Sequence, residues 1–277
     1  MGARREAREA LAAAGLRPRK RWGQHFLCDG GVARRVVETA GLGPRSVALE
    51  IGPGLGALTD ELAARAGRLY LVEVDRGLAT RLAARYADDP RVRVLVGDVL
   101  ALPLADLVTE PSVTVVANLP YNISTPVVFR LLELRERFPR AVLMLQREVA
   151  ARLAAGPGSA EYGLTSVLVQ AFAEVRVAFG VSRRSFLPRP EVDSAVVDVR
   201  WSAAPRADLG DPERFRAVVR AAFGQRRKML RNALAGLAAE RGVRPETACA
   251  FAGIGPTARA ETLDLAAFAR LARAFGG

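Results

Sequence analysis

The chain has 277 residues, and hydrophobic residues make up 50% of them. This is enough apolar material for one large domain and a smaller one, and it excludes global disorder. The 41 basic residues outnumber the 29 acidic residues by 12, which favours a polyanionic partner, either a nucleic acid or an anionic membrane surface.

Residue usage disfavours several kinds of site and location. Cys28 and Cys249 are the only cysteines and lie far apart, which points to a reducing compartment, so we expect a cytoplasmic protein. His25 is the only histidine, which disfavours zinc sites and Ser/His/Asp arrangements. Charged residues interrupt the apolar runs before they could span a bilayer, and the N-terminus lacks the apolar stretch of a signal peptide.

From Val47 onward, apolar runs of strand length alternate with amphipathic stretches, which is typical of a parallel sheet with helices on both faces. The predicted strands are Val47–Ile51, Arg68–Val74, Arg91–Val96, Val113–Ala117, Ala141–Gln146, Val167–Ala178 and Ala195–Trp201. The predicted helices between them are Ala57–Ala66, Gly77–Tyr86, Pro126–Arg137 and Glu148–Ala155. No clear helix separates the last two strands, so we expect an antiparallel edge on an otherwise parallel sheet.

The strand signals stop after Trp201. A polar segment with Pro205 and Gly210 follows, and apolar residues then keep a helical period from Phe215 to Leu237. We therefore expect an α/β domain over residues 1–204 and a small helical domain over residues 205–277.

A predicted strand runs into a glycine-rich turn and a helix within Val47–Thr59. Gly52, Gly54 and Gly56 permit the tight turn that brings backbone amides close to a nucleotide-like ligand. The turn also fits a dinucleotide fingerprint, because Glu73 follows Gly52 by 21 residues, the position of the ribose-binding acid in NAD enzymes. A tight turn with a purely structural role is a further alternative.

Acidic residues stand at the ends of successive predicted strands. Glu50 precedes the glycines, Glu73 ends the second strand, and Asp98 follows the third. Ligands of open α/β sheets bind at this carboxyl edge. Glu73 can accept from both hydroxyls of a ribose and Asp98 from the amino group of an adenine, although each acid alone could be a solvated carboxylate.

The segment Asn118-Leu119-Pro120-Tyr121-Asn122 follows the fourth predicted strand. Pro120 restricts the backbone and favours an extended Leu119. The Asn118 amide oxygen and the Leu119 carbonyl can then accept both hydrogens of an exocyclic base amine, which frees the lone pair of its nitrogen. The Tyr121 ring offers the base a stacking surface. The alternative is that this segment only turns the chain and that Tyr121 packs in the core.

Phe186 is a second aromatic candidate. It lies in a segment stiffened by Pro188 and Pro190, just before the last predicted strand. Its ring could cover the other face of the base, and a phenylalanine of the core is the ordinary alternative.

These segments resemble the ribosomal RNA adenine dimethyltransferases, a family that includes the bacterial small-subunit enzymes and the macrolide-resistance methylases. The resemblance extends over nearly the whole chain. It rests on Arg19–Leu27, Leu49–Gly56, Glu73, Gly97-Asp98, Asn118–Pro126 and Phe186–Ser194.

The resemblance implies a class I methyltransferase fold, with a Rossmann-like, mostly parallel sheet of seven strands, that binds S-adenosylmethionine. The implied cofactor-binding residues are Gln24, His25, Leu27, Gly52, Gly54, Glu73, Asp98 and Asn118. Many relatives have Asn at the position of His25, so a backbone contact is expected there rather than a side-chain contact.

Basic residues gather in the C-terminal part. The segment Ala222–Leu234 resembles the small-subunit enzymes more than the resistance methylases. Residues 214–231 contain seven basic side chains and no acidic one, and charge-assisted contacts with several phosphates are expected. The predicted RNA-binding residues are Arg226, Arg227, Lys228 and Arg231. A solvated charged helix face is the alternative.

The expected reaction, implied by the resemblance, transfers methyl groups from S-adenosylmethionine to N6 of two adjacent adenosines. These lie in a hairpin loop near the 3′ end of small-subunit (16S) rRNA in a pre-ribosomal particle, and each is dimethylated. The predicted catalytic residues are Asn118, Leu119, Tyr121 and Phe186. We expect a cytoplasmic monomer that needs no metal. The alternatives are a methyltransferase of large-subunit rRNA or DNA adenines, an NAD-dependent oxidoreductase, and a binding module that holds pre-ribosomal particles.

Overall fold

The computed structural model describes residues 9, 23–225 and 227–276. The chain folds into two compact units, Met1–Ala150 with Val175–Trp201 and Ala151–Glu174 with Ser202–Gly277. The change of unit after Trp201 lies close to the predicted boundary at residues 204 and 205. Residues 151–174 group with the second unit, where the Tyr162 hydroxyl donates to the Leu263 carbonyl at 2.9 Å.

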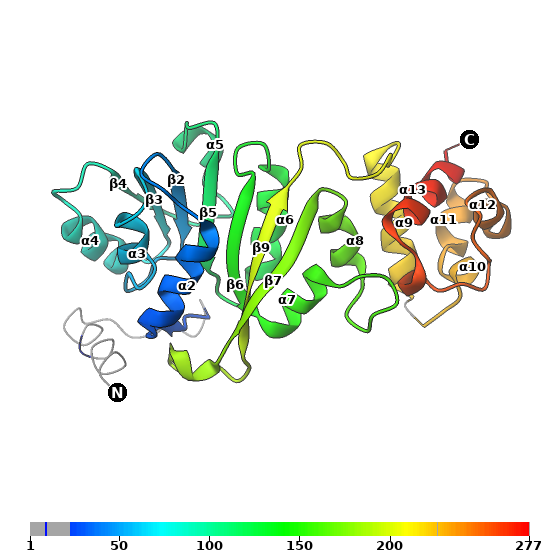
Figure 1. Cartoon of the computed structure of the whole chain (residues 1–277). Helices are drawn as coiled ribbons and strands as arrows, with labels where there is room; N and C mark the ends of the chain where they lie inside the picture. Colours follow the sequence, from blue (N-terminus) through cyan, green and yellow to red (C-terminus); the bar gives the residue numbers. More distant parts are fainter. Residues whose placement is uncertain (1–8, 10–22, 226, 277) are drawn as a thin grey trace. The chain divides into compact units, whose positions relative to one another are not determined.

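A seven-stranded sheet with the order β4-β3-β2-β5-β6-β9-β7 runs through the first unit (Figure 1). Its strands are β2 (Val47–Ile51), β3 (Arg68–Glu73), β4 (Val92–Val96), β5 (Val113–Asn118), β6 (Arg140–Gln146), β7 (Ala173–Val181) and β9 (Ser194–Trp201). Strands β4 to β6 are parallel neighbours, and β9 runs antiparallel to β6. The prediction of a mostly parallel sheet with an antiparallel component is confirmed.

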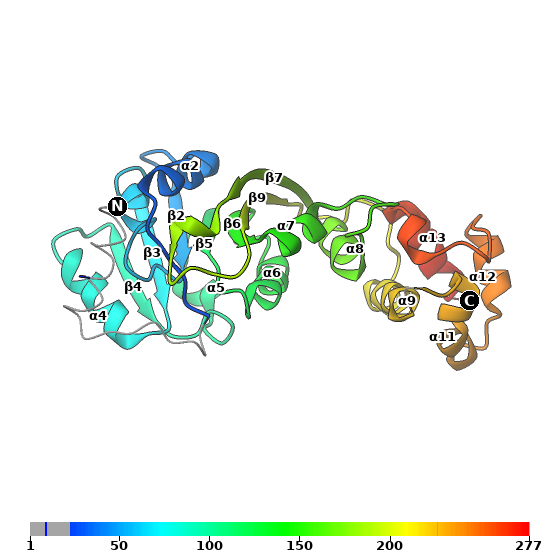
Figure 2. The ribbon, with the colours of Figure 1, turned by 90° about the horizontal axis from the view of Figure 1, so that it is seen from below.

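Helices cover both faces of this sheet, because its central strands β2, β5 and β6 are apolar and buried on both sides. They are α2 (Gly30–Ala40), α3 (Thr59–Ala63), α4 (Arg76–Arg85), α5 (Leu104–Leu107), α6 (Ser124–Glu133) and α7 (Arg147–Ala154). Figure 2 shows α2 and α6 on opposite sides of the sheet. Val36 and Val37 of α2 are fully buried in one core cluster with Val116 of β5 and Val142 of β6.

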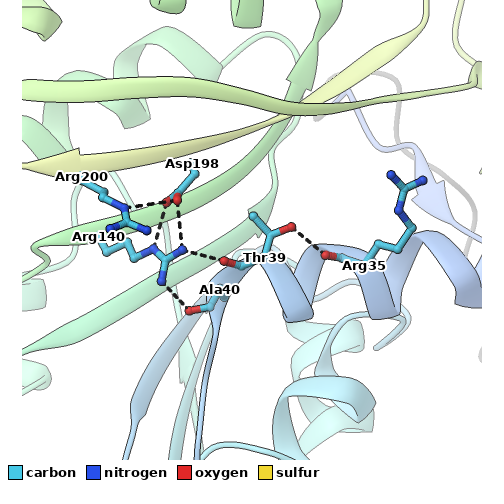
Figure 3. Close-up of polar contacts among 6 residues, drawn as sticks. All are labelled: Arg35, Thr39, Ala40, Arg140, Asp198 and Arg200. Carbon is cyan, nitrogen blue, oxygen red and sulfur yellow. Dashed lines mark hydrogen bonds and ion pairs between the residues drawn. The ribbon is translucent and has the colours of Figure 1, made fainter.

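Arg140 fastens the C-terminal end of α2 to the sheet (Figure 3). Its guanidinium pairs with Asp198 of the neighbouring strand β9, with 2.9 Å between Nε and Oδ1. It also donates to the carbonyls of Thr39 at 2.6 Å and Ala40 at 2.8 Å. The last turn of α2 contains no basic residue, so Arg140 supplies the cation that the negative end of the helix dipole favours.

A small second sheet was not predicted from the sequence. It pairs β1 (Phe26–Leu27) with β8 (Phe186–Leu187) in antiparallel register, and the short helix η2 (Arg183–Ser185) precedes β8. Strands of two residues are too short to show an alternating pattern. The pairing brings the N-terminal segment beside the segment that precedes β9.

The predicted strand Val167–Ala178 is wrong in its first half. Helix α8 (Leu164–Gln170) occupies it, and β7 begins only at Ala173. The residues Ser166 to Val169 are all buried, and a continuous apolar run does not distinguish a strand from a buried helix. The amide of Gly163, which donates to the Ser166 hydroxyl at 3.1 Å, marks the start of the helix.

The second unit is helical after Trp201, as predicted. Its further helices are α9 (Pro212–Gly224), α10 (Leu230–Ala233), α11 (Ala235–Glu240), α12 (Pro245–Phe251), η3 (Ala260–Thr262) and α13 (Leu265–Ala274). Asp211 caps α9 by accepting from the Arg214 amide, and Pro212 fits the first turn. Phe215 and Phe268 bury their rings in this unit. In the described part of the chain, no helix is long and apolar enough to cross a membrane.

Candidate active site

The carboxyl ends of the parallel strands bring several predicted site residues to one edge of the sheet. Ile51 lies in register with Val72 and Ala117, and Asn118 lies in register with Met144. A cavity of about 180 Å³ is present at this edge. The predicted site residues that line it are Gln24, His25, Leu27, Gly52, Gly54, Glu73, Asp98, Asn118, Leu119 and Tyr121. The structure therefore brings together all the predicted catalytic and cofactor-binding residues except Phe186.

The glycine-rich turn forms one wall of the cavity. Gly54 has a φ of 58°, and a Cβ atom there would lie 3.0 Å from the Phe26 ring. Gly52 has a φ of 67°, and its amide donates to the Val72 carbonyl at 2.9 Å. The positive φ disfavours a side chain at both positions, and at Gly54 the Phe26 ring also leaves little space for one, so a ligand can approach the backbone itself.

Glu73 is held in place by backbone amides. Its two carboxylate oxygens accept from the amides of Gly54 at 3.1 Å and Asp75 at 2.9 Å. The side chain is only 3% exposed, and burial raises the pKa of Glu73 although these two hydrogen bonds lower it. The carboxylate therefore has a fixed position, and each oxygen retains acceptor capacity for a ligand hydroxyl.

Asp98 lies on the same wall and is solvent-exposed. One of its carboxylate oxygens accepts from the Leu100 amide at 2.9 Å, which fixes the side chain in a turn after β4. An exposed acceptor at the rim suits the polar edge of a base better than a catalytic group that must be shielded from water.

Glu50 contributes a buried carboxyl group that the sequence showed only as a neighbour of the glycines. It lines the cavity, is 1% exposed, and accepts from the Thr59 hydroxyl at 2.7 Å. Burial raises the pKa of Glu50 to about 8; Glu73 and Asp60 add to this rise, and the Thr59 hydrogen bond opposes it. This wall thus holds a group that is largely protonated at neutral pH.

Asn118 is oriented by the N-terminal segment. Its amide nitrogen donates to the His25 carbonyl at 3.0 Å. A carbonyl can only accept, so the amide nitrogen must face His25 and the amide oxygen must face the other way. The backbone of His25 makes this contact, and its ring takes no part in it.

Tyr121 also lines the cavity. Its hydroxyl lies 2.8 Å from the Ser194 hydroxyl, and burial raises the pKa of Tyr121. The His25 ring lies 5.3 Å from the Tyr121 ring, with 31° between the planes. The His25 Nδ1 atom is 2.8 Å from the Pro188 carbonyl oxygen. Sequence reasoning assigned no role to Ser194, which carries no local signal beyond its place at the start of a strand.

Phe186 does not line the cavity, so the structure does not place it over a second face of a base. Its side chain is 1% exposed and belongs to the core cluster beneath α2. In β8 it is the register partner of Leu27, and this pairing turns its ring inward. The ordinary alternative, a phenylalanine of the core, describes its position.

The predicted RNA-binding residues belong to the second unit. Arg227, Lys228 and Arg231 are exposed around the start of α10, and Arg226 lies outside the described residues. Over residues 9, 23–225 and 227–276, no group of three or more His, Cys, Asp or Glu side chains is arranged to hold a metal ion.

The sheet order, the antiparallel β9 and the glycine-rich turn after β2 define a class I methyltransferase fold. Residues 15–275 match the family described as "Ribosomal RNA adenine dimethylase". The chain belongs to the ribosomal RNA adenine dimethylase family.

Several relatives match over nearly their full length. The chain is 48% identical to "Ribosomal RNA small subunit methyltransferase A" of Syntrophotalea carbinolica, covering 93% of this chain and 96% of the relative. It is 47% identical to the protein of the same name from Geobacter sulfurreducens, covering 94% and 95%. Among solved structures, the 23S rRNA methyltransferase ErmE matches with a TM-score of 0.69 and 29% identity over 91% of this chain and 100% of that one. A dimethyladenosine transferase from Plasmodium falciparum shares the fold, with a TM-score of 0.74, 24% identity, and coverage of 89% and 96%.

Proposed function

We propose that this protein transfers methyl groups from S-adenosylmethionine to N6 of two adjacent adenosines in small-subunit rRNA. These lie in a hairpin loop near its 3′ end, and each is dimethylated. The observation that carries the proposal is the fixed orientation of Asn118, whose amide oxygen is available to an amine because its nitrogen binds the His25 carbonyl. The near-full-length similarity to small-subunit methyltransferases supports the choice of rRNA.

The turn side of the cavity fits S-adenosylmethionine. A Cβ at Gly54 would intrude on Phe26, and the Glu73 carboxylate is held ready to accept from ribose hydroxyls. Asp98 can accept from the adenine amino group. The other predicted contacts are His25, Leu27, Gly52, Asn118 and Gln24, with Gln24 near the methionine end. When bound, the cofactor supplies an electrophilic methyl group on a sulfonium.

The residues on the other side prepare the target nitrogen. The Asn118 amide oxygen and the Leu119 carbonyl accept the two hydrogens of the N6 amine, which favours a pyramidal nitrogen with a free lone pair. The Tyr121 ring stacks on the base. Methylation leaves the nitrogen cationic and its proton acidic, so water can take the proton. Adenines in a loop suit this site because they unstack at modest cost.

The test is a methylation assay with two substrates. Purified protein is incubated with labelled S-adenosylmethionine and with small or large ribosomal subunits that lack adenine methylation, and N6,N6-dimethyladenosine is mapped by mass spectrometry. We expect the product in two adjacent loop adenosines of the small subunit. Dimethyladenosine in the large subunit alone would overturn the proposed substrate. Binding of S-adenosylmethionine without methyl transfer would overturn the proposed activity.

We further propose that residues 205–277 bind RNA, with Arg226, Arg227, Lys228 and Arg231 contacting phosphates. Replacing Arg227, Lys228 and Arg231 together with Ala removes three described cations. We expect the slope of log K against log salt for small-subunit rRNA to become shallower by about 2, at ~0.7 per lost contact. An unchanged slope would show that these cations are only a solvated surface.

The proposal also places the protein in the cytoplasm, where it acts as a monomer on a pre-ribosomal particle. Activity without a metal ion belongs to the same proposal. Full methylation in the presence of a chelator, by a protein that elutes as a monomer, is the expected outcome.

A further inference from the structure

The Tyr121 ring is half-buried and lies in a turn, outside the regular hydrogen bonding of the sheet. The turn follows β5 directly, so the backbone fixes one end of the side chain near Asn118. The other end, the hydroxyl group, extends from this turn and needs its own hydrogen-bond partner if the ring is to keep one position.

Ser194 provides that support from a different strand. It is the first residue of β9, lies in register with Gln146 of β6, and is 1% exposed. Its hydroxyl lies 2.8 Å from the Tyr121 hydroxyl. The Tyr121 hydroxyl is therefore hydrogen-bonded to a buried side chain of a sheet strand.

The residue before Ser194 is itself tied on two sides. The Asp193 carbonyl accepts from the Arg147 amide at 3.0 Å, and an Asp193 carboxylate oxygen accepts from the Arg183 amide at 2.9 Å. These bonds hold the start of β9 against the end of β6 and against η2. The Ser194 hydroxyl therefore cannot easily follow a movement of Tyr121.

We propose that Ser194 is a positioning residue for methyl transfer, which fixes the far end of the Tyr121 ring and thereby the position of the stacked adenine relative to the Asn118 amide oxygen. The inference rests on the proposed function. A base that tilts with a released ring carries its N6 atom away from the two acceptors, and a displacement of about 1 Å can cost on the order of 100-fold in rate.

The hydrogen bond can be removed from either end. Ser194→Ala removes it from the buried strand, and Tyr121→Phe removes it from the turn while the ring is kept. The experiment measures kcat and KM for unmethylated small subunits and the Kd of S-adenosylmethionine, for both single variants and the double variant. Melting temperatures establish that each variant is folded. If Ser194→Ala does not fold, Tyr121→Phe still tests the hydrogen bond, because it changes no residue of β9.

We expect each single variant to lower kcat about tenfold, with the Kd of S-adenosylmethionine unchanged. The double variant should be no slower than the slower single variant, because both changes remove the same bond. Ser166→Ala is the matched control, since Ser166 is also fully buried and its hydroxyl also forms a hydrogen bond, but the partner is the Arg152 carbonyl and not a residue that lines the cavity. It should leave kcat unchanged.

Wild-type kcat in Tyr121→Phe or in a folded Ser194→Ala would overturn the inference while the proposed function stands. Multiplicative losses in the double variant, or a loss confined to S-adenosylmethionine binding, would also overturn it. If the wild-type protein methylates no small subunits, the proposed function fails first and the inference fails with it.

Discussion

The two sides of the cavity are held by different kinds of contact. On the turn side, formed by Gly52, Gly54 and Glu73, backbone amides donate to a buried carboxylate close along the chain. On the amide side, formed by Asn118 and Tyr121, side chains bind partners that are 93 and 73 residues away. The turn side, to which the proposed function assigns cofactor binding, is thus fixed by backbone, and the amide side, to which it assigns methyl transfer, by side-chain hydrogen bonds. The Kd of S-adenosylmethionine and the kcat of methyl transfer should therefore respond to different substitutions.

Asn118→Ala should separate the two sides most strongly. It removes the acceptor for the N6 amine, and loss of one preorganised polar group of an active site lowers kcat by about 10²–10³-fold. The turn side is untouched, so binding of S-adenosylmethionine should remain measurable although Asn118 is itself a predicted cofactor contact. Radiolabelled methyl transfer and calorimetric titration measure the two effects. Retained turnover would remove Asn118 from the mechanism.

Glu73→Gln should have the opposite signature. It removes the charge that receives the ribose hydroxyls, and a hydrogen bond to a charged group contributes about 1.5–3 kcal/mol, so the Kd of S-adenosylmethionine should rise ~10–100-fold. At saturating cofactor, kcat should recover to near the wild-type value. A kcat that stays low under saturation would mean that the two sides are not separable.

Glu50→Gln tests whether the turn side makes stability depend on pH. The folded chain keeps the Glu50 proton up to its pKa of about 8, whereas an ordinary carboxyl group loses it near 4.5. The free energy of unfolding therefore falls as pH rises through this window. The variant still accepts from Thr59 but cannot ionise. Its Tm at pH 8 should exceed that of the wild type by at least about 2–4 °C, the shift for ~1 kcal/mol in a chain of this size.

Thermal unfolding at several pH values measures this effect. At pH 4, where Glu50 is protonated in both the folded and unfolded chains, the two proteins should melt alike. Parallel Tm curves for wild type and variant across the whole window would contradict the buried neutral carboxyl.

His25→Asn should have the smallest effect. The backbone carbonyl of residue 25, which orients Asn118, is kept, and only the ring contacts with Tyr121 and Pro188 are lost. An aromatic contact of ~0.6 kcal/mol corresponds to about a threefold loss of kcat/KM. Steady-state kinetics on small subunits provide the measurement. A loss as large as that of Asn118→Ala would show that activity depends on the His25 imidazole and not only on the backbone carbonyl of residue 25.

The difference between local contacts on the turn side and long-range contacts on the amide side also explains which site residues the sequence could predict. The turn side is a contiguous strand, glycine turn and helix, and Glu73 follows at a fixed distance, so its residues were predicted together. Asn118 and Tyr121 were predicted because they stand in one short segment with Pro120.

The partners of these side chains could not be predicted. Ser194 and the His25 carbonyl reach the site through tertiary contacts that leave no local pattern. For the same reason, Phe186 was expected at the base although the pairing of β8 with β1 turns it into the core. The prediction for α8 was wrong for a different reason, because Val167, Leu168 and Val169 are consecutive buried apolar residues and show no helical period.

The antiparallel direction of β9 has a consequence for how the chain tolerates insertions. A strand parallel to β6 would end at the cavity, but β9 begins there, with Ser194 opposite Gln146. A slip of one residue between β6 and β9 would turn Ser194 to the other face of the sheet and exchange the faces on which all the side chains of this largely buried strand lie. Residue insertions between β8 and β9 that shift this register would therefore disable the site, even where every residue that touches the ligand is unchanged.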